Sequence, residues 1–119
     1  MMVAEEWARA IGHDPARGRF SLLVEGHEGF VDYLLDGSTM TITHTVVPAP
    51  IGGRGIAAAL VRAALDHARA QGWRVVPRCS YADAWMRRHP EYEGLRADAP
   101  PPPASGGRGG ERGSPWGRG

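Results

Sequence analysis

The clearest structural signal in this sequence is an amphipathic stretch at residues 54–71. Its apolar residues recur at intervals of three and four, which places them on one face of an α-helix. They are Ile56, Leu60, Val61, Ala64, Leu65 and Ala68. Gly72 follows and is the type of residue that ends a helix. A helix with a single apolar face has to bury that face against another layer of structure.

The segments before this helix have the composition of β-strands. Three runs are rich in apolar and β-branched residues, and Asp36-Gly37 between the last two is a strong hairpin signal. The predicted strands are 19–25, 30–35 and 39–47, with a turn at 26–29. Pro48 ends the third strand, because proline cannot donate to a ladder. We therefore expect an antiparallel three-stranded meander.

A short apolar run at 73–77 follows the helix, and we expect it to be a fourth strand parallel to the third. Ser80 and Asp83 have the spacing of a capping box, which predicts a short helix at about 81–88. The order of elements indicates an α+β, or mixed α/β, domain with one sheet.

The chain of 119 residues has room for one domain. We expect residues 1–12 to form an arm or a short helix at 3–11, and residues 13–97 to form the domain. Residues 98–119 are rich in Pro, Gly and Arg, which predicts a disordered tail. Its few arginines could bind RNA, but they are too few to make that interpretation attractive.

Composition excludes several classes of protein. The net charge of +1 does not indicate a basic nucleic-acid binder, and Cys79 is the single cysteine, so no internal disulfide is expected. The histidines lack the spacing of metal ligands, and no metal is inferred. No signal peptide or membrane span is evident, so we expect a cytoplasmic protein.

Three glycines among four residues stand directly before the long helix, in the segment Gly52–Ala57. The first N–H groups of a helix lack internal partners, and together with the helix dipole they form an anion site. Arg54 adds a guanidinium that suits phosphate oxygens. The pattern is neither a P-loop nor a dinucleotide fingerprint, and a turn that only reverses the chain stays open as an alternative.

Several motifs in order resemble a compact branch of the GNAT acetyltransferase superfamily. They are His-Thr-Val-Val-Pro at 44–48, Gly-Gly-Arg-Gly-Ile-Ala at 52–57, Pro-Arg-Cys-Ser-Tyr at 77–81 and His-Pro-Glu-Tyr at 89–92. The resemblance covers about residues 13–96. It implies acetyl-CoA as co-substrate, bound along the backbone of Val46 and Val47.

The resemblance also assigns the coenzyme's diphosphate to the N–H groups of Gly53, Arg54, Gly55, Ile56 and Ala57. At Gly52 the sequence departs from the superfamily, which usually has Arg or Gln there. That departure loses one side-chain contact, while the backbone cradle should remain.

Cys79 and His44 are the candidate catalytic residues. Cys79 stands between a predicted strand and a helix N-terminus, a location that lowers a thiol pKa, although a small space-filling cysteine is the alternative. Histidine is a residue type suited to acid–base work near neutrality, and strand alternation places His44 on the face of Ile42 and Val46. A packed strand histidine is the alternative for His44.

Tyr81 is grouped with the coenzyme-binding residues, where its hydroxyl would protonate the leaving thiolate or its ring would only pack. Arg87, Arg88 and His89 either meet coenzyme phosphates or form a solvated helix end. The predicted function is acetyl transfer to a small-molecule or protein amine by a monomer or weak homodimer. A non-catalytic acyl-CoA-binding module is the alternative.

Overall fold

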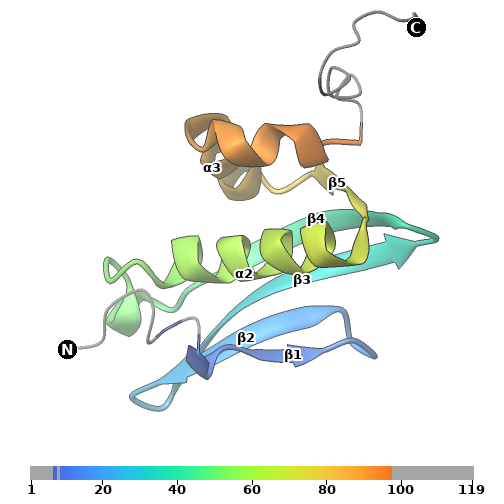
Figure 1. Ribbon diagram of the computed structural model, residues 1–119. Helices are drawn as coiled ribbons and strands as arrows, with labels where there is room; N and C mark the ends of the chain where they lie inside the picture. Colours follow the sequence, from blue (N-terminus) through green and yellow to red (C-terminus); the bar gives the residue numbers. More distant parts are fainter. Residues whose placement is uncertain (1–6, 8, 98–119) are drawn as a thin grey trace, which may run out of the picture.

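A computed structural model of the chain describes residues 7 and 9–97, and in it a five-stranded sheet carries its helices on one side and along one edge (Figure 1). The strands are β1 (Gly12–Asp14), β2 (Arg19–Val24), β3 (His27–Asp36), β4 (Thr39–Val46) and β5 (Arg74–Pro77). The helices are α2 (Ile56–Gln71) and α3 (Ser80–Arg88), with 3₁₀ turns η1 (Ala49–Ile51) and η2 (Pro90–Leu95).

The strands lie in the order β1-β2-β3-β4-β5, and every neighbouring pair is antiparallel except β4 and β5, which are parallel. The predicted meander, the helix after it and the parallel fourth strand are therefore confirmed. So is the mixed α/β fold class.

Helix α2 packs its predicted stripe against β2, β3 and β4. All six predicted core residues of the helix are buried, none more than 1% exposed. Gly72 ends the helix in the left-handed conformation at φ 76°, and its N–H binds the carbonyls of Ala68 and Arg69. Burying a stripe of this size is the main source of stability that the sheet and helix share.

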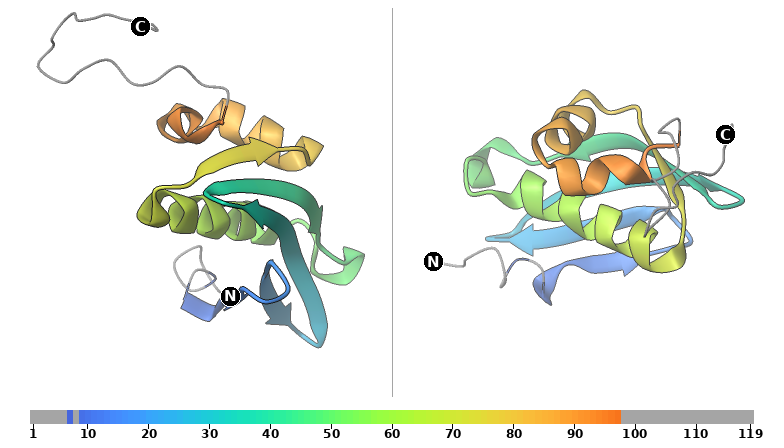
Figure 2. Two further views of the ribbon diagram at one scale, coloured as in Figure 1. Left: turned by 90° about the vertical axis from the view of Figure 1, so that its right-hand side faces the viewer. Right: turned by 45° about the horizontal axis from the view of Figure 1, so that its top comes forward.

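The opposite face of the sheet is not covered by a helix of the described chain over β2 and β3 (Figure 2). Leu23 is 71% exposed and Leu34 is 66% exposed on that face. We call it the open face. The described residues therefore form two layers, with the core between α2 and the sheet.

Helix α3 begins one residue earlier than predicted, and the capping-box prediction was wrong. Cys79, and not Ser80, is the N-cap residue. The Asp83 carboxylate instead forms ion pairs with Arg96 at 2.8 Å and with Arg87 at 3.0 Å. Two guanidiniums thus hold the carboxylate away from the helix terminus.

Two further differences concern the first half of the chain. The predicted turn at 26–29 was placed too late: Glu25 and Gly26 make a two-residue turn with φ 53° and 80°, and β3 already begins at His27. Strand β1 was not predicted. Of the predicted helix at 3–11, Trp7, Arg9 and Ala10 are helical and several other positions lie outside the described residues, as does the predicted tail at 98–119.

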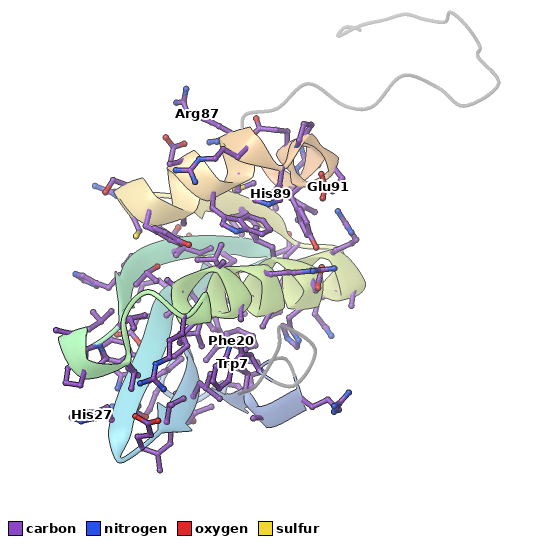
Figure 3. All side chains as sticks on the ribbon, turned by 90° about the vertical axis from the view of Figure 1, so that its left-hand side faces the viewer. Trp7, Phe20, His27, Arg87, His89 and Glu91 are labelled. Atoms are coloured by element: carbon purple, nitrogen blue, oxygen red, sulfur yellow. The ribbon has the colours of Figure 1, made fainter. Side chains whose placement is uncertain are left out.

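A cluster of aromatic rings joins β1 to α2. His13 stacks on Phe20 with ring centroids 4.0 Å apart and its Nε2 lies 2.6 Å from the Tyr33 hydroxyl. His67 of α2 meets the His13 ring edge-on at 4.6 Å. Figure 3 shows Phe20 and Trp7 on one side of α2 and His89 on the other. These contacts attach the short edge strand to the core.

We predict that stability falls as the pH drops below the unfolded-state pKa of His13. Burial and the neighbouring His67 lower the pKa of His13 from 6.5 in the folded protein, against an opposing effect of Asp14. Below pH 6.5 the unfolded chain therefore binds a proton at this position more readily than the folded chain does. The free energy of unfolding has its full value above pH 6.5 and decreases as the pH falls toward the lowered folded-state pKa of His13.

Urea unfolding of wild type and of His13→Phe between pH 7 and pH 5 tests this. The variant keeps the stacked ring and cannot titrate, so its midpoint should move less with pH. His27→Gln, which removes a histidine from the start of β3, serves as the control and should follow wild type. An unchanged pH slope in His13→Phe would contradict the assignment.

Candidate active site

The Gly-rich turn leads from β4 into α2 through two left-handed glycines. Gly53 has φ 75° and Gly55, the N-cap of α2, has φ 83°. Side chains are strained at such angles, so glycine is required at both positions for the path of the backbone. A Cβ at either one would meet no atom within 4 Å, so the space beside the turn is open.

No capping side chain accepts a hydrogen bond from the N–H groups in the first turn of α2. Gly55 supplies none, and no acidic residue lies in the first turn. The first intrahelical bond runs from the Ala59 N–H to the Gly55 carbonyl, which leaves the N–H groups of Ile56, Ala57 and Ala58 without a helical acceptor. The donor set and the open space fit a phosphate group.

The Arg54 side chain, which the sequence suggested as a phosphate ligand, is engaged by another part of the protein. Its guanidinium binds the Glu25 carboxylate through two hydrogen bonds of 2.9 and 3.0 Å. Glu25 belongs to the β2–β3 turn, so this ion pair connects that turn to the Gly-rich turn.

The sheet splits beside the turn. The β4–β5 ladder ends at the pair Ile42 and Pro77, and the Ile42 carbonyl then accepts from the N–H groups of both Arg78 and Cys79. Strand β4 continues to Val46 on the β3 side, and Val47 after it packs partly against the core. Beyond Ile42 the backbone edge of β4 that faces β5 is therefore without a strand partner among the described residues.

His44 lies on the open face, and the prediction that it shares a face with Ile42 was wrong. A register shift between Asp32 and Tyr33 inserts one extra residue into β4, so His44 pairs with Asp32. Opposed residues point to the same face, while Ile42 is fully buried beneath α2. His44 does share the open face with Val46, which pairs with Phe30.

Cys79 lies on the other face of β4, beside Thr45. Its thiol lies 3.4 Å from the Thr45 hydroxyl, and its own exposure is intermediate. Burial raises the pKa of Cys79, but hydrogen bonds from the Thr45 side chain and from the backbone of Ala82, Tyr81 and Thr45 outweigh it, so the pKa is lowered. The site therefore favours the thiolate.

Thr45 is the residue that the sequence reasoning missed. Its neighbour His44 is the obvious acid–base group by residue type, and simple alternation would have placed Thr45 on the outer face. Only the bulge turns Thr45 toward Cys79. The structure consequently brings Cys79 to Thr45 and holds His44 on the opposite side of the same strand.

Tyr81 stands in the first turn of α3 and is 37% exposed. Burial raises the pKa of its phenol, Arg88 opposes this and Cys79 adds to it, with a net upward shift. The hydroxyl therefore stays protonated at neutral pH. At the other end of α3, His89 stacks on Trp85 at 3.8 Å and Arg87 binds Asp83.

The described residues also form a hollow of about 540 Å³ at the far end of α2, and none of the predicted site residues lines it. Within residues 7 and 9–97, no group of three or more His, Cys, Asp or Glu side chains is arranged to hold a metal ion. No helix in that part of the chain combines the length and apolar character needed to cross a bilayer.

A sheet that splits beside a helix start, with a Gly-rich turn before the preceding helix, defines the class of GNAT-fold acetyltransferases. The chain belongs to the GCN5-related N-acetyltransferase family, whose sequence profile matches residues 19–95. A solved structure of a GCN5-like protein from Staphylococcus aureus, determined by NMR, matches with a TM-score of 0.58 and 22% identity. The match covers 76% of this chain and 89% of that one, and at this identity it shows the fold.

We predict that Thr45→Val slows alkylation of Cys79 at neutral pH. The substitution keeps the shape of the side chain and removes a hydrogen bond that stabilises the thiolate. A bond of ~1 kcal/mol corresponds to a rate about fivefold lower. Because Cys79 is the single cysteine, iodoacetamide labelling followed by intact mass gives the rate directly.

Thr41→Val is the matched control, since Thr41 lies on the same strand and pairs with Leu34 away from the thiol. Its labelling rate should equal that of wild type at every pH. Equal rates in Thr45→Val and Thr41→Val would show that Thr45 does not acidify the thiol.

Proposed function

We propose that this chain is an N-acetyltransferase that uses acetyl-CoA and transfers the acetyl group to an amine acceptor. The observation that carries the proposal is the uncapped start of α2 behind two left-handed glycines, at the edge where the sheet splits. The N–H groups of residues 53–57 would hold the diphosphate, and Gly52 would line the entry to this turn. Family membership supports the class of reaction.

The pantetheine arm would lie in the split between β4 and β5. Its amides can pair with the unpartnered edge of β4 near Val46 and Val47, in the manner of an added strand. This path leads the thioester toward Cys79, which stands where β5 has ended. The acetyl carbonyl would accept from a backbone N–H of the same edge.

The two candidate catalytic residues approach this position from opposite faces. His44 on the open face would accept a proton from the acceptor ammonium, since only the neutral amine is nucleophilic. Cys79 and Tyr81 lie on the other side of the strand, near the leaving sulfur. The arrangement separates deprotonation of the amine from protonation of the thiolate.

Two routes of acetyl transfer are compatible with this arrangement, and they form and break bonds in a different order. In direct transfer the amine nitrogen forms the new C–N bond, the thioester C–S bond breaks, and the coenzyme thiolate takes a proton from Cys79 or Tyr81. In the covalent route the Cys79 thiolate forms a C–S bond to the acetyl carbon, the C–S bond to the coenzyme breaks, and the coenzyme sulfur takes a proton from Tyr81. The amine nitrogen then forms the C–N bond, and the bond to Cys79 breaks and restores its thiolate.

A non-catalytic acyl-CoA-binding module is the second candidate. The observation that favours it is the separation of His44 from Cys79, because each lies on its own face of β4 and no hydrogen bond joins them in the described structure. Such a module would bind acetyl-CoA at the same turn without accelerating its aminolysis.

We predict that Gly52→Arg binds coenzyme A about fivefold more tightly, since it adds one charge-assisted contact to a phosphate. The backbone accepts a side chain here, because Gly52 has φ −70° and an added Cβ would come no closer than 3.4 Å to the Ala49 carbonyl. Isothermal titration of wild type and variant with coenzyme A measures the change.

Gly12→Arg is the control for that titration. It adds the same charge at β1, where a Cβ meets nothing within 4 Å, and should leave the affinity near that of wild type. Absence of binding in wild type would remove the proposed function altogether.

We predict that Cys79→Ala and His44→Ala each slow coenzyme-A release in the presence of an amine about 10²–10⁴-fold, the usual range for loss of a proton-transferring group. A thiol-detecting dye with a panel of small amines, polyamines and lysine peptides provides the assay. Intact mass after incubation with acetyl-CoA alone separates the routes, since only the covalent route adds an acetyl group to the Cys79 sulfur. The Cys79→Ser variant has no sulfur at this position and cannot form that thioester.

Unchanged release in both variants would contradict the assigned roles. Binding of acetyl-CoA without release for any amine of the panel would favour the non-catalytic module.

A further inference from the structure

Arg54 is the residue of the Gly-rich turn whose polar groups bind distant parts of the described chain. This residue stands between Gly53 and Gly55, the two left-handed glycines of the turn. Both its side chain and its carbonyl have partners from distant parts of the chain. The orientation of the turn's N–H groups therefore depends on what holds Arg54.

The side chain of Arg54 is held from the β2–β3 turn. Glu25 accepts two hydrogen bonds from the guanidinium, at 2.9 and 3.0 Å, and the same group also donates to the Pro50 carbonyl at 3.3 Å. The bidentate geometry fixes direction as well as distance. One guanidinium thus links the β2–β3 turn, η1 and the Gly-rich turn.

The carbonyl of Arg54 is held from the N-terminal segment. The Trp7 indole Nε1 donates to it at 3.2 Å, and the Trp7 ring is buried, with 4% exposed. A buried ring has little freedom, so its N–H is a fixed point for the carbonyl. The peptide between Arg54 and Gly55 is consequently oriented by a group outside the turn.

Glu25 occupies an unfavourable backbone conformation. It is the one non-glycine residue among those described with a positive φ, 53°, in a two-residue turn that favours Asn or Gly at this position. Backbone strain of this kind persists where the surroundings impose it and often marks a functional position. The bidentate bond to Arg54 is the contact that the side chain gains there.

We propose that Arg54 braces the Gly-rich turn and is not itself a phosphate ligand, and that Glu25 and Trp7 are positioning residues for the coenzyme's diphosphate. This inference rests on the proposed function, because it assumes that the turn's N–H groups bind the diphosphate. It differs from the sequence-based expectation, in which the Arg54 guanidinium contacts phosphate oxygens directly.

The two roles of Arg54 predict opposite effects of removing the Glu25 charge. If Arg54 is a brace, Glu25→Gln loosens the turn and weakens coenzyme-A binding. If Arg54 is a ligand, Glu25 competes with phosphate for it, and Glu25→Gln strengthens binding. Nonspecific attraction of a polyanion also strengthens in Glu25→Gln, so weaker binding is a result that only the brace explains.

The experiment is a double-mutant cycle measured by isothermal titration of the full chain with coenzyme A. We expect Glu25→Gln and Arg54→Gln each to weaken binding about two- to fivefold, the range of an exposed ion pair, and the double variant to be no weaker than either. Trp7→Phe, which keeps a ring and removes the N–H, should also weaken it. Glu28→Gln on β3 is the charge-matched control and should not.

S-acetylpantetheine separates positioning from a general loss of structure, since it lacks the diphosphate. A variant that only loosens the turn should bind it as wild type does. Stronger or unchanged coenzyme-A binding in Glu25→Gln would overturn the brace while leaving the proposed function in place. Failure of wild type to bind coenzyme A would instead remove the proposed function itself.

Discussion

The burial of α2 on the sheet is the constraint from which the site follows. A helix that leaves β4, crosses one face and returns a strand parallel to β4 brings the carboxyl ends of both strands to one edge. Each strand is followed there by a helix start, Gly55 before α2 and Cys79 before α3. Two helix starts, whose first N–H groups have no acceptor within the helix, therefore converge near the point where the ladder ends at Ile42.

The periodic parts of this fold could be predicted from sequence and the irregular parts could not. The stripe of α2 and the parallel β5 follow from apolar spacing and chain length, which are local properties. The bulge that turns His44 outward depends on the pairing of β3 with β4, and a one-residue shift exchanges the faces of a strand. For that reason, the sequence alone could not predict that Thr45 lies beside Cys79 and contributes to the environment of its thiol.

Several departures from regular structure lie close to the site. Glu25 has a positive φ, Gly53 and Gly55 are left-handed, and the β4 bulge directly precedes His44. Each departure costs conformational freedom or strain that a purely structural element would avoid. Natural sequences tend to break local rules at functional positions, and here the broken rules concern the backbone that would present N–H groups to the coenzyme.

At both helix starts, the groups positioned to stabilise a negative charge are neutral hydrogen-bond donors. The Cys79 thiolate is favoured by a hydroxyl and by backbone N–H groups, and the α2 start offers backbone N–H groups with no acidic neighbour in its first turn. At the α2 start, the charged side chain of Arg54 is paired with Glu25. Fixed dipoles lose less to salt than free charges and need no reorganisation when a charge arrives. In the proposed binding of the coenzyme, a precisely oriented backbone, held by residues such as Trp7, would therefore take the place of net charge.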